Sequence, residues 1–183
     1  MMSNNTTNPN SRETETLCID DIELTIRPIA ITDAERLARL FTRLSPASVH
    51  SRFFSPIARP PRAALLRLAD VDHRRRDALV ALDGDEIVAV ARYDGRTNPD
   101  RSRSSQAEIA MTVEDSWQRR GLGKRLAQRL AVLAADRGYD TFVATVLPDN
   151  RAALGLMRKL VPDVSVRWAG GDYEADMPLM HAS

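Results

Sequence analysis

One stretch, Met111–Leu126 (MTVEDSWQRRGLGKRL), constrains the fold of this chain more than any other. It joins the end of a predicted strand, Ser105–Val113, to the start of a strongly patterned helix. After Gly121 the leucines recur on one helical face, while basic and amide side chains occupy most of the other; these leucines are Leu122, Leu126, Leu130 and Leu133. The turn therefore places two glycines and several cations at a helix N-terminus.

This turn has the composition of an anion-binding loop. The first N–H groups of a helix lack internal partners, and the helix dipole favours negative charge beside them. Glycines let the backbone approach a ligand closely, and successive N–H groups can then face one concavity. Arginines can add forked hydrogen bonds to phosphate oxygens. An ordinary solvated turn that contains glycine and arginine is the alternative, and the spacing alone leaves both open.

Two other phosphate-binding motifs do not fit this turn. A P-loop needs a glycine five residues before its Gly-Lys pair and a serine or threonine after the lysine, where this chain has Gln118 and Arg125. A dinucleotide-binding fingerprint needs a third glycine where Leu126 stands.

The segment Gln118-Arg119-Arg120-Gly121-Leu122-Gly123 resembles the Q/R-x-x-G-x-G/A acetyl-CoA motif of the GNAT superfamily of N-acetyltransferases. The order of elements agrees, because a strand precedes the motif and a long helix, a strand (Thr141–Leu147) and Asn150 follow it. The resemblance extends from about Leu24 onward. It implies a mixed α/β (α+β) fold, in which a central, mostly antiparallel sheet has a splayed strand pair at the acetyl-CoA site and helices on both faces.

The resemblance also implies which residues bind acetyl-CoA. The strand end contributes backbone groups to the pantetheine arm, the turn holds the pyrophosphate, and an asparagine faces the cofactor. These positions are Met111, Thr112, Val113, Gln118, Arg119, Arg120, Gly121, Leu122, Gly123, Lys124 and Asn150. For Asn150 a helix-capping role is the alternative, and both roles are compatible.

Glu108 is the candidate general base. Acetyl transfer to an amine requires a neutral nitrogen, and a lysine amine has a pKa near ~10.4, so a nearby base must remove a proton. A carboxylate in a half-buried cleft suits this task. Ala107-Glu108-Ile109-Ala110 resembles the A-E-[IV]-A strand that carries the base in bacterial protein lysine acetyltransferases. The alternative is an outward-facing glutamate paired with an arginine.

One position departs from the family pattern. Many relatives have a tyrosine seven residues after the asparagine, which protonates the leaving thiolate, and this chain has Met157 there. The thiolate then leaves unprotonated, or takes its proton from water or from another residue. Tyr139 and Tyr173 are candidates without support from spacing.

The acceptor side is suggested by Ser45–Pro56 (SPASVHSRFFSP), which resembles the S-P-x-S-x-x-x-R-F-F stretch of bacterial protein lysine acetyltransferases. In the superfamily this region borders the acceptor, so Arg52 and Phe54 are candidate substrate residues. The segments 46–54 and 94–104 are the expected walls, and no carboxylate pair in them suggests an anchor for a small amine. The favoured acceptor is a protein lysine. The alternatives are a small amine, or a CoA-binding sensor or interaction module without catalysis.

Bulk composition bounds the remaining possibilities. A chain of 183 residues predicts one domain, here 17–183 after a disordered leader at 1–16. The formal net charge of +1 gives no field for nucleic acid. The single cysteine, Cys18, excludes an internal disulfide and fits a reducing, cytoplasmic location. We find no signal-peptide pattern, no membrane-length apolar run and no metal-ligand pattern. The expected assembly is a monomer or homodimer.

Periodicity and turn residues predict the other elements. Expected helices are Ala34–Leu44 with Thr32 or Asp33 as cap, Pro46–Phe54, Arg59–Ala69, and Arg151–Leu160 with Asp149 as cap. Expected strands are Ile22–Ile29, Ala78–Leu82, Glu86–Tyr93, Val164–Trp168 and Tyr173–Leu179, with a polar loop over Asp94–Ser104.

Overall fold

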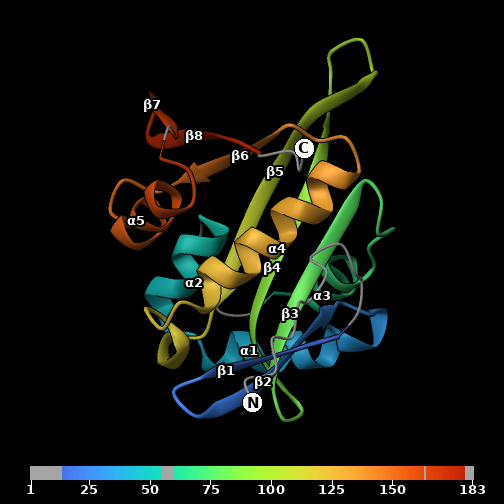
Figure 1. Cartoon of the computed structure of the whole chain (residues 1–183), viewed down its shortest axis with the longest axis vertical. Helices are drawn as coiled ribbons and strands as arrows, with labels where there is room; N and C mark the ends of the chain where they lie inside the picture. The colour runs from blue at the N-terminus through green and yellow to red at the C-terminus, as the bar shows by residue number, and fades with distance from the viewer. Residues whose placement is uncertain (1–13, 55–59, 163, 180–183) are drawn as a thin grey trace, which may run out of the picture.

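The computed structural model of the chain describes residues 14–54, 60–162 and 164–179, and within them the strands form a single sheet. The strand order is β1-β2-β3-β4-β5-β6-β8-β7, and among the named strands only β5 and β6 run parallel to each other (Figure 1). The strands are β1 (Glu15–Ile19), β2 (Ile22–Pro28), β3 (Arg76–Asp83), β4 (Glu86–Thr97), β5 (Arg103–Val113), β6 (Thr141–Val146), β7 (Ser165–Ala169) and β8 (Asp172–Pro178).

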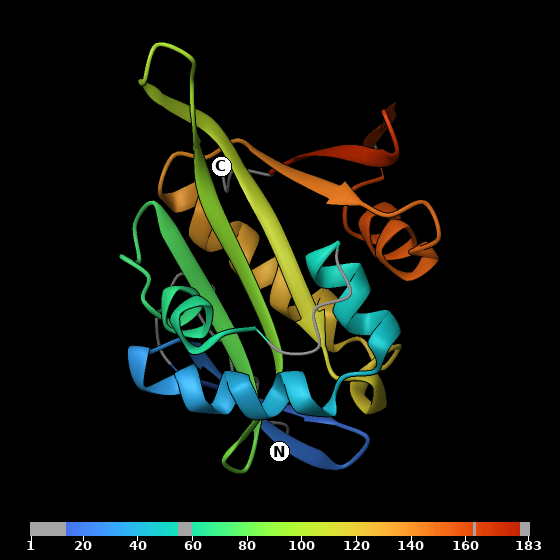
Figure 2. The ribbon, with the colours of Figure 1, turned by 180° about the vertical axis from the view of Figure 1, so that it is seen from behind.

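Helices cover both faces of this sheet, which confirms the predicted mixed α/β architecture. The long helix α4 (Leu122–Asp136) crosses one face, and α5 (Arg151–Leu160) lies beside it (Figure 1). The opposite face carries α1 (Ala34–Arg43), α2 (Pro46–Phe53) and α3 (Arg62–Ala69), as Figure 2 shows. Two short 3₁₀ helices, η1 (Ile31–Asp33) and η2 (Asp115–Trp117), precede α1 and α4.

Alternating side chains on the central strands divide the core in two. The predicted leucine stripe of α4 is fully or almost fully buried and packs with Ala107 of β5 on one face. On the other face Leu37, Leu40 and Phe41 of α1 pack against β3 and β4. Residues of β5 with odd numbers therefore face α4, whereas Glu108 and Ala110 face the side of α1, α2 and α3.

The N-terminal boundary differs from the prediction. Glu15 and Thr16, expected within a disordered leader, belong to β1, which pairs with β2. The alternation of β1 lets Leu17 and Ile19 pack against the α4-side core, while the Glu15 carboxylate bonds Arg125 and Arg129 of α4. These partners lie more than 100 residues away, so local sequence could not reveal the strand. Residues 1–13 of the expected leader lie outside the described residues.

Two other boundaries also shift. The predicted loop 94–104 shrinks to residues 98–102, because β4 continues to Thr97 and β5 already begins at Arg103. The predicted helix Arg59–Ala69 begins at Arg62, while Arg59 lies outside the described residues. Asp33 directly precedes α1, but its buried carboxylate accepts hydrogen bonds from Arg27 and from Ala30 N–H and does not cap that helix.

Candidate active site

The predicted splayed strand pair consists of β5 and β6. These strands pair only through Gln106–Thr141, Ala107–Phe142 and Glu108–Val143. Beyond Glu108, residues 109–113 remain paired with β4 but no longer pair with β6. An extended ligand arm can use this freed strand edge, because strand backbone groups alternate between donors and acceptors.

The turn that follows β5 has the backbone geometry of an anion-binding nest. Arg119 (φ 61°) and Gly121 (φ 87°) both adopt left-handed conformations. The first bond of α4 runs from Arg125 N–H to the Gly121 carbonyl at 3.1 Å. Within the described part of the chain, the backbone N–H groups of residues 119–124 have no hydrogen-bond acceptor, as expected at a helix start. These donors, with the dipole of α4, form a site for a pyrophosphate group.

The two glycines of the turn serve different purposes. A Cβ added to Gly121 would meet no atom within 4 Å, so its role is conformational. A Cβ on Gly123 would lie 3.1 Å from the Met111 sulfur and 3.6 Å from Val113, so this glycine lets α4 approach the end of β5. The Leu122 side chain is fully buried, which leaves only its backbone for a ligand.

The cationic side chains of the turn point to solvent. Arg119, Arg120 and Lys124 are exposed. Arg120 lies over the Trp117 ring at 5.2 Å and 3.4 Å from Asp20, whereas Arg119 and Lys124 have no side-chain partner among the described residues. Both are therefore available to a phosphate.

Gln118 has a structural role that the motif did not indicate. Its amide nitrogen donates to the Val113 carbonyl and to the Ser48 hydroxyl, both at 3.1 Å. It therefore ties β5 to α2. The neighbouring Thr112 is 5% exposed, and its hydroxyl oxygen has no hydrogen-bond partner within the described residues.

Asn150 is the helix cap of α5. Its side-chain oxygen accepts from Ala153 N–H at 3.0 Å, so the expectation that Asp149 caps this helix is wrong. Asn150 follows β6, the strand that diverges from β5, and its amide nitrogen has no acceptor among the described residues.

Glu108 lies at the last β5–β6 pair, on the face covered by α2. Its side chain is exposed, not half-buried, and it forms no ion pair with any described residue. The half-buried Arg52 of α2 interacts with it electrostatically: burial lowers the pKa of Arg52, nearby Arg92 lowers it further, and Glu108 opposes both. The structure thus brings Glu108 and Arg52 to the same face, as the sequence suggested.

Arg92 is a further candidate site residue, which the sequence analysis did not identify. It pairs with Ala110 across β4 and β5, so it shares the face of Glu108, and burial lowers its pKa. Together Arg52 and Arg92 line a cavity of about 10 Å³ between α1, α2 and the sheet. Phe54, the other predicted acceptor residue, is 41% exposed at the C-terminus of α2. The register of the β4–β5 hairpin was the signal that could have identified Arg92.

The structure places the residues considered for protonating the leaving thiolate in different surroundings. Met157 is buried in the core on the α4 face. Tyr139 is fully buried beyond the other end of α4, where its hydroxyl donates to the Arg75 carbonyl at 3.4 Å, so it is not available. Tyr173 is half-buried and pairs with Val146 at the end of β6.

A mixed sheet that splays beside a glycine-rich helix N-terminus is the arrangement that the resemblance to N-acetyltransferases implies. The chain belongs to the acetyltransferase (GNAT) family, whose model matches residues 40–160. It is therefore an acyltransferase, and acetyl-CoA is the co-substrate that this family uses.

Individual relatives agree with this assignment. The chain is 32% identical over 158 residues to acetyltransferase PA5475 of Pseudomonas aeruginosa, covering 81% of this chain and 82% of that protein. The GNAT domain of S. lividans PAT superposes with a TM-score of 0.82 at 28% identity, covering 91% of this chain and 97% of that one. The fold also matches yncA of Salmonella typhimurium, solved with its cofactor acetyl-CoA (TM-score 0.66, 19% identity, 87% and 96% covered).

The described residues contain no group of three or more His, Cys, Asp and Glu side chains that could hold a metal ion. None of the described helices combines the length and apolar character needed to cross a membrane.

Proposed function

We propose that this enzyme transfers the acetyl group of acetyl-CoA directly to a lysine side chain of a protein, with Glu108 as general base. The observation that carries the proposal is the position of Glu108: an exposed carboxylate stands where β5 and β6 part, on the face where α2 presents Arg52 and Phe54.

The donor would occupy the opening between β5 and β6. The N–H groups of the turn and the side chains of Arg119 and Lys124 would hold its pyrophosphate, while Met111, Thr112 and Val113 offer the freed strand edge to its pantetheine arm. Acetyl-CoA supplies the thioester carbon that the amine attacks. Binding of acetyl-CoA by these N–H groups and cationic side chains does not require a metal ion.

Glu108 would accept a proton from the incoming ammonium group, directly or through one water molecule. The neutral nitrogen then attacks the thioester carbonyl, a carbon–nitrogen bond forms, and the carbon–sulfur bond breaks as CoA thiolate leaves. The nitrogen releases its second proton to that thiolate or to solvent water.

A protein acceptor is supported by the openness of this face. Glu108 and Phe54 are both exposed, and the cavity beside Arg52 holds only about 10 Å³, too small to enclose an amine substrate. The resemblance of residues 45–54 to protein lysine acetyltransferases points the same way. A small amine remains the alternative acceptor.

The base is tested with Glu108→Gln, which keeps the shape of the side chain and removes its basicity. We expect turnover, measured as released thiol, to fall by ~10²–10⁴-fold while the thermal shift given by acetyl-CoA is unchanged. Glu23→Gln removes another exposed carboxylate of the same sheet and should keep full activity. Full activity in Glu108→Gln would place the base elsewhere.

The acceptor class is tested by incubating a lysate with enzyme and labelled acetyl-CoA, followed by mass spectrometry. We expect label on protein lysines, and a loss of about tenfold or more in Arg52→Ala/Phe54→Ala, as is typical when two contact residues are removed. Arg67→Ala, an exposed site on α3, is the control. Self-modification is easily recognised because Lys124 and Lys159 are the only lysines. Label confined to small amines would replace this proposal by the small-amine alternative.

A further inference from the structure

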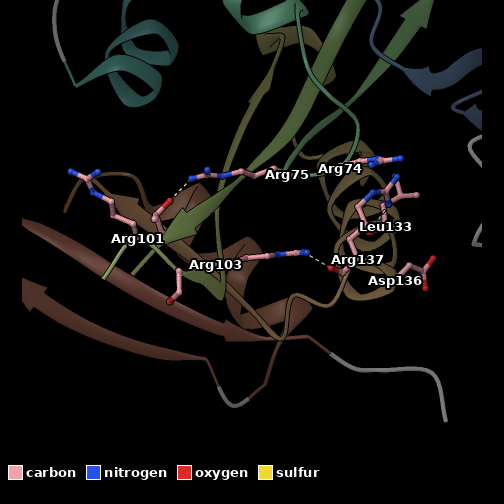
Figure 3. A pocket seen from close by; sticks show the side chains of 9 residues that line it. Arg74, Arg75, Arg101, Arg103, Leu133, Asp136 and Arg137 are labelled. Atoms are coloured by element: carbon pink, nitrogen blue, oxygen red, sulfur yellow. Dashed lines mark hydrogen bonds between the residues drawn. The ribbon is translucent and has the colours of Figure 1, made fainter. Parts of the chain in front are cut away.

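One cavity in the described part of the molecule lies far from the donor turn, at the C-terminal end of α4. Its volume is about 670 Å³, within the range of small-ligand sites. Three segments surround it: the approach to β3, the tip of the β4–β5 hairpin and the end of α4 (Figure 3). The lining residues are Arg74, Arg75, Thr97, Arg101, Ser102, Arg103, Leu133, Asp136 and Arg137.

Five of these nine residues are arginines and one is a carboxylate, so the cavity concentrates positive charge in a protein whose net charge is only +1. Many arginines elsewhere in this fold pair with acids. The α1 residues Arg36, Arg39 and Arg43, for example, all pair with carboxylates. Among the cavity arginines only Arg137 forms an ion pair within the described residues, with Asp77 behind the cavity at 3.1 Å.

The other arginines contact neutral groups or none. Arg75 donates to the Gly95 carbonyl at 3.1 Å and to the Thr97 hydroxyl. Arg103 donates to the Arg137 carbonyl and lies 4.6 Å above the Tyr139 ring. Neutral acceptors orient a guanidinium without cancelling its charge. The exposed side chains of Arg74 and Arg101 have no partner among the described residues.

The framework around this cavity is firmly packed. A Cβ on Gly95 would lie 1.9 Å from the Tyr139 hydroxyl, so a glycine is required for β4 to pass over this ring. Arg137 also donates to the His73 carbonyl at 2.9 Å and to the Leu133 carbonyl at 2.6 Å. Arg137 and Arg103 thereby satisfy terminal carbonyls of α4, whose dipole would otherwise repel an anion.

We propose that this arginine-lined cavity binds a compact polyphosphate, a ligand that carries two or more linked phosphoryl groups. Arginine forks match phosphate oxygens, and the hydroxyls of Thr97 and Ser102 are additional donors. Several uncancelled cations within one small cavity call for a ligand with several charges close together. The lining contains no aromatic side chain for base stacking, so the phosphate chain, not a nucleobase, is the recognised part.

The test is calorimetric titration of the full chain with tripolyphosphate in 0.15 M salt, with and without saturating CoA. CoA blocks the donor turn, the other phosphate site of this molecule. We expect saturable one-site binding that persists with CoA. Arg74→Gln/Arg101→Gln removes two side chains without structural partners and should weaken binding about tenfold or more. Arg67→Gln/Arg158→Gln makes the same charge change at exposed sites on α3 and α5 and should leave affinity within about twofold.

Three results would overturn the proposal: no saturable binding, equal weakening by both double variants, or loss of binding when CoA is present. Tighter binding of hexaglutamate than of tripolyphosphate would also overturn it and indicate an acidic peptide. ATP tests whether a nucleoside attached to the phosphate chain is recognised as well. Affinity for ATP equal to that for tripolyphosphate supports recognition of the phosphate chain alone, and clearly higher affinity for ATP would overturn that statement and indicate a nucleotide site.

Discussion

Gly121 stands where a left-handed backbone, empty space and a helix N-terminus coincide. Any side chain at this position would project from the nest that we assign to the pyrophosphate. A residue other than glycine must also adopt a positive backbone φ here, at a cost of about 1–2 kcal/mol. Gly138, at the other end of α4, has a nearly identical φ of 80° and equally open surroundings. The two positions therefore make a matched pair.

Acetyl-CoA should raise the melting temperature of the wild-type protein, because a ligand that binds only the native state stabilises it. Gly121→Glu should abolish this shift through steric exclusion and like charge, and Gly138→Glu should retain it, although both substitutions strain the free protein. Thermal melts of the three proteins with and without acetyl-CoA check this. An intact shift in Gly121→Glu would remove the pyrophosphate assignment.

Sequence reasoning reached some residues of the site and missed others for a physical reason. Gly121 and Gly123 could be singled out because their conformations depend on the local chain, and Glu108 because its strand resembles a family motif; the roles of all three stay predictions. Gln118 was placed in the turn correctly, but its bond to Ser48 joins positions 70 residues apart. Arg92 required the hairpin register, which local sequence patterns do not give.

At the scale of elements, α2 is docked onto the donor turn by one carboxylate. Asp115 of η2 accepts from Ser45 N–H at 3.0 Å, from the Ser45 hydroxyl at 2.7 Å and from the Ser48 hydroxyl at 2.9 Å. Burial acts to raise the pKa of Asp115, but these hydrogen bonds outweigh it and hold the pKa below its usual value of 3.8. The helix bearing Arg52 is thus fixed to the segment that leads into the donor turn.

This docking predicts a defined pH dependence. Because the folded pKa is depressed, ionised Asp115 stabilises the fold above pH 3.8, and this contribution is lost as the pH falls through the lower folded value. Urea unfolding of wild type and Asp115→Asn should differ by about 1 kcal/mol from pH 5 to 7, since the site is largely exposed. The difference should shrink below about pH 4. A difference that is constant down to pH 3 would contradict the assignment.

Whole elements were predictable where their signals were local. The helix Arg151–Leu160 and the leucine face of α4 follow from periodicity alone. The β4–β5 hairpin extends beyond its predicted length because contacts with Tyr139 and Arg75 order a polar segment. Propensity carries no information about such distant partners.

At the scale of the molecule, β1 forms one edge of the sheet and is tied to α4 by the ion pairs of Glu15. The Glu15 side chain is 10% exposed and lies 3.1 Å from Arg129, whose side chain is 7% exposed. Removing one member of a buried ion pair leaves the other charge poorly compensated. Glu15→Gln should therefore lower the free energy of unfolding by about 2–3 kcal/mol, a discounted value because Arg129 keeps the Ile26 carbonyl as a partner.

Glu174→Gln provides the comparison for this measurement. Its partner, Arg167, is 61% exposed, so the loss should stay below about 1 kcal/mol. Denaturant titrations of wild type, Glu15→Gln and Glu174→Gln measure the two losses in the free energy of unfolding. Equal losses would mean that β1 is not anchored by Glu15.

Helix α4 also sets the distance between the two phosphate sites that we propose. Its 15 residues span about 22 Å from the donor turn to the arginine-lined cavity. A small ligand at one end cannot touch a ligand at the other, so any influence between them is a coupling free energy transmitted by the helix and by β5, which also spans both sites. Such coupling is reciprocal: if a polyphosphate changes the affinity for acetyl-CoA by some factor, acetyl-CoA changes the affinity for the polyphosphate by the same factor.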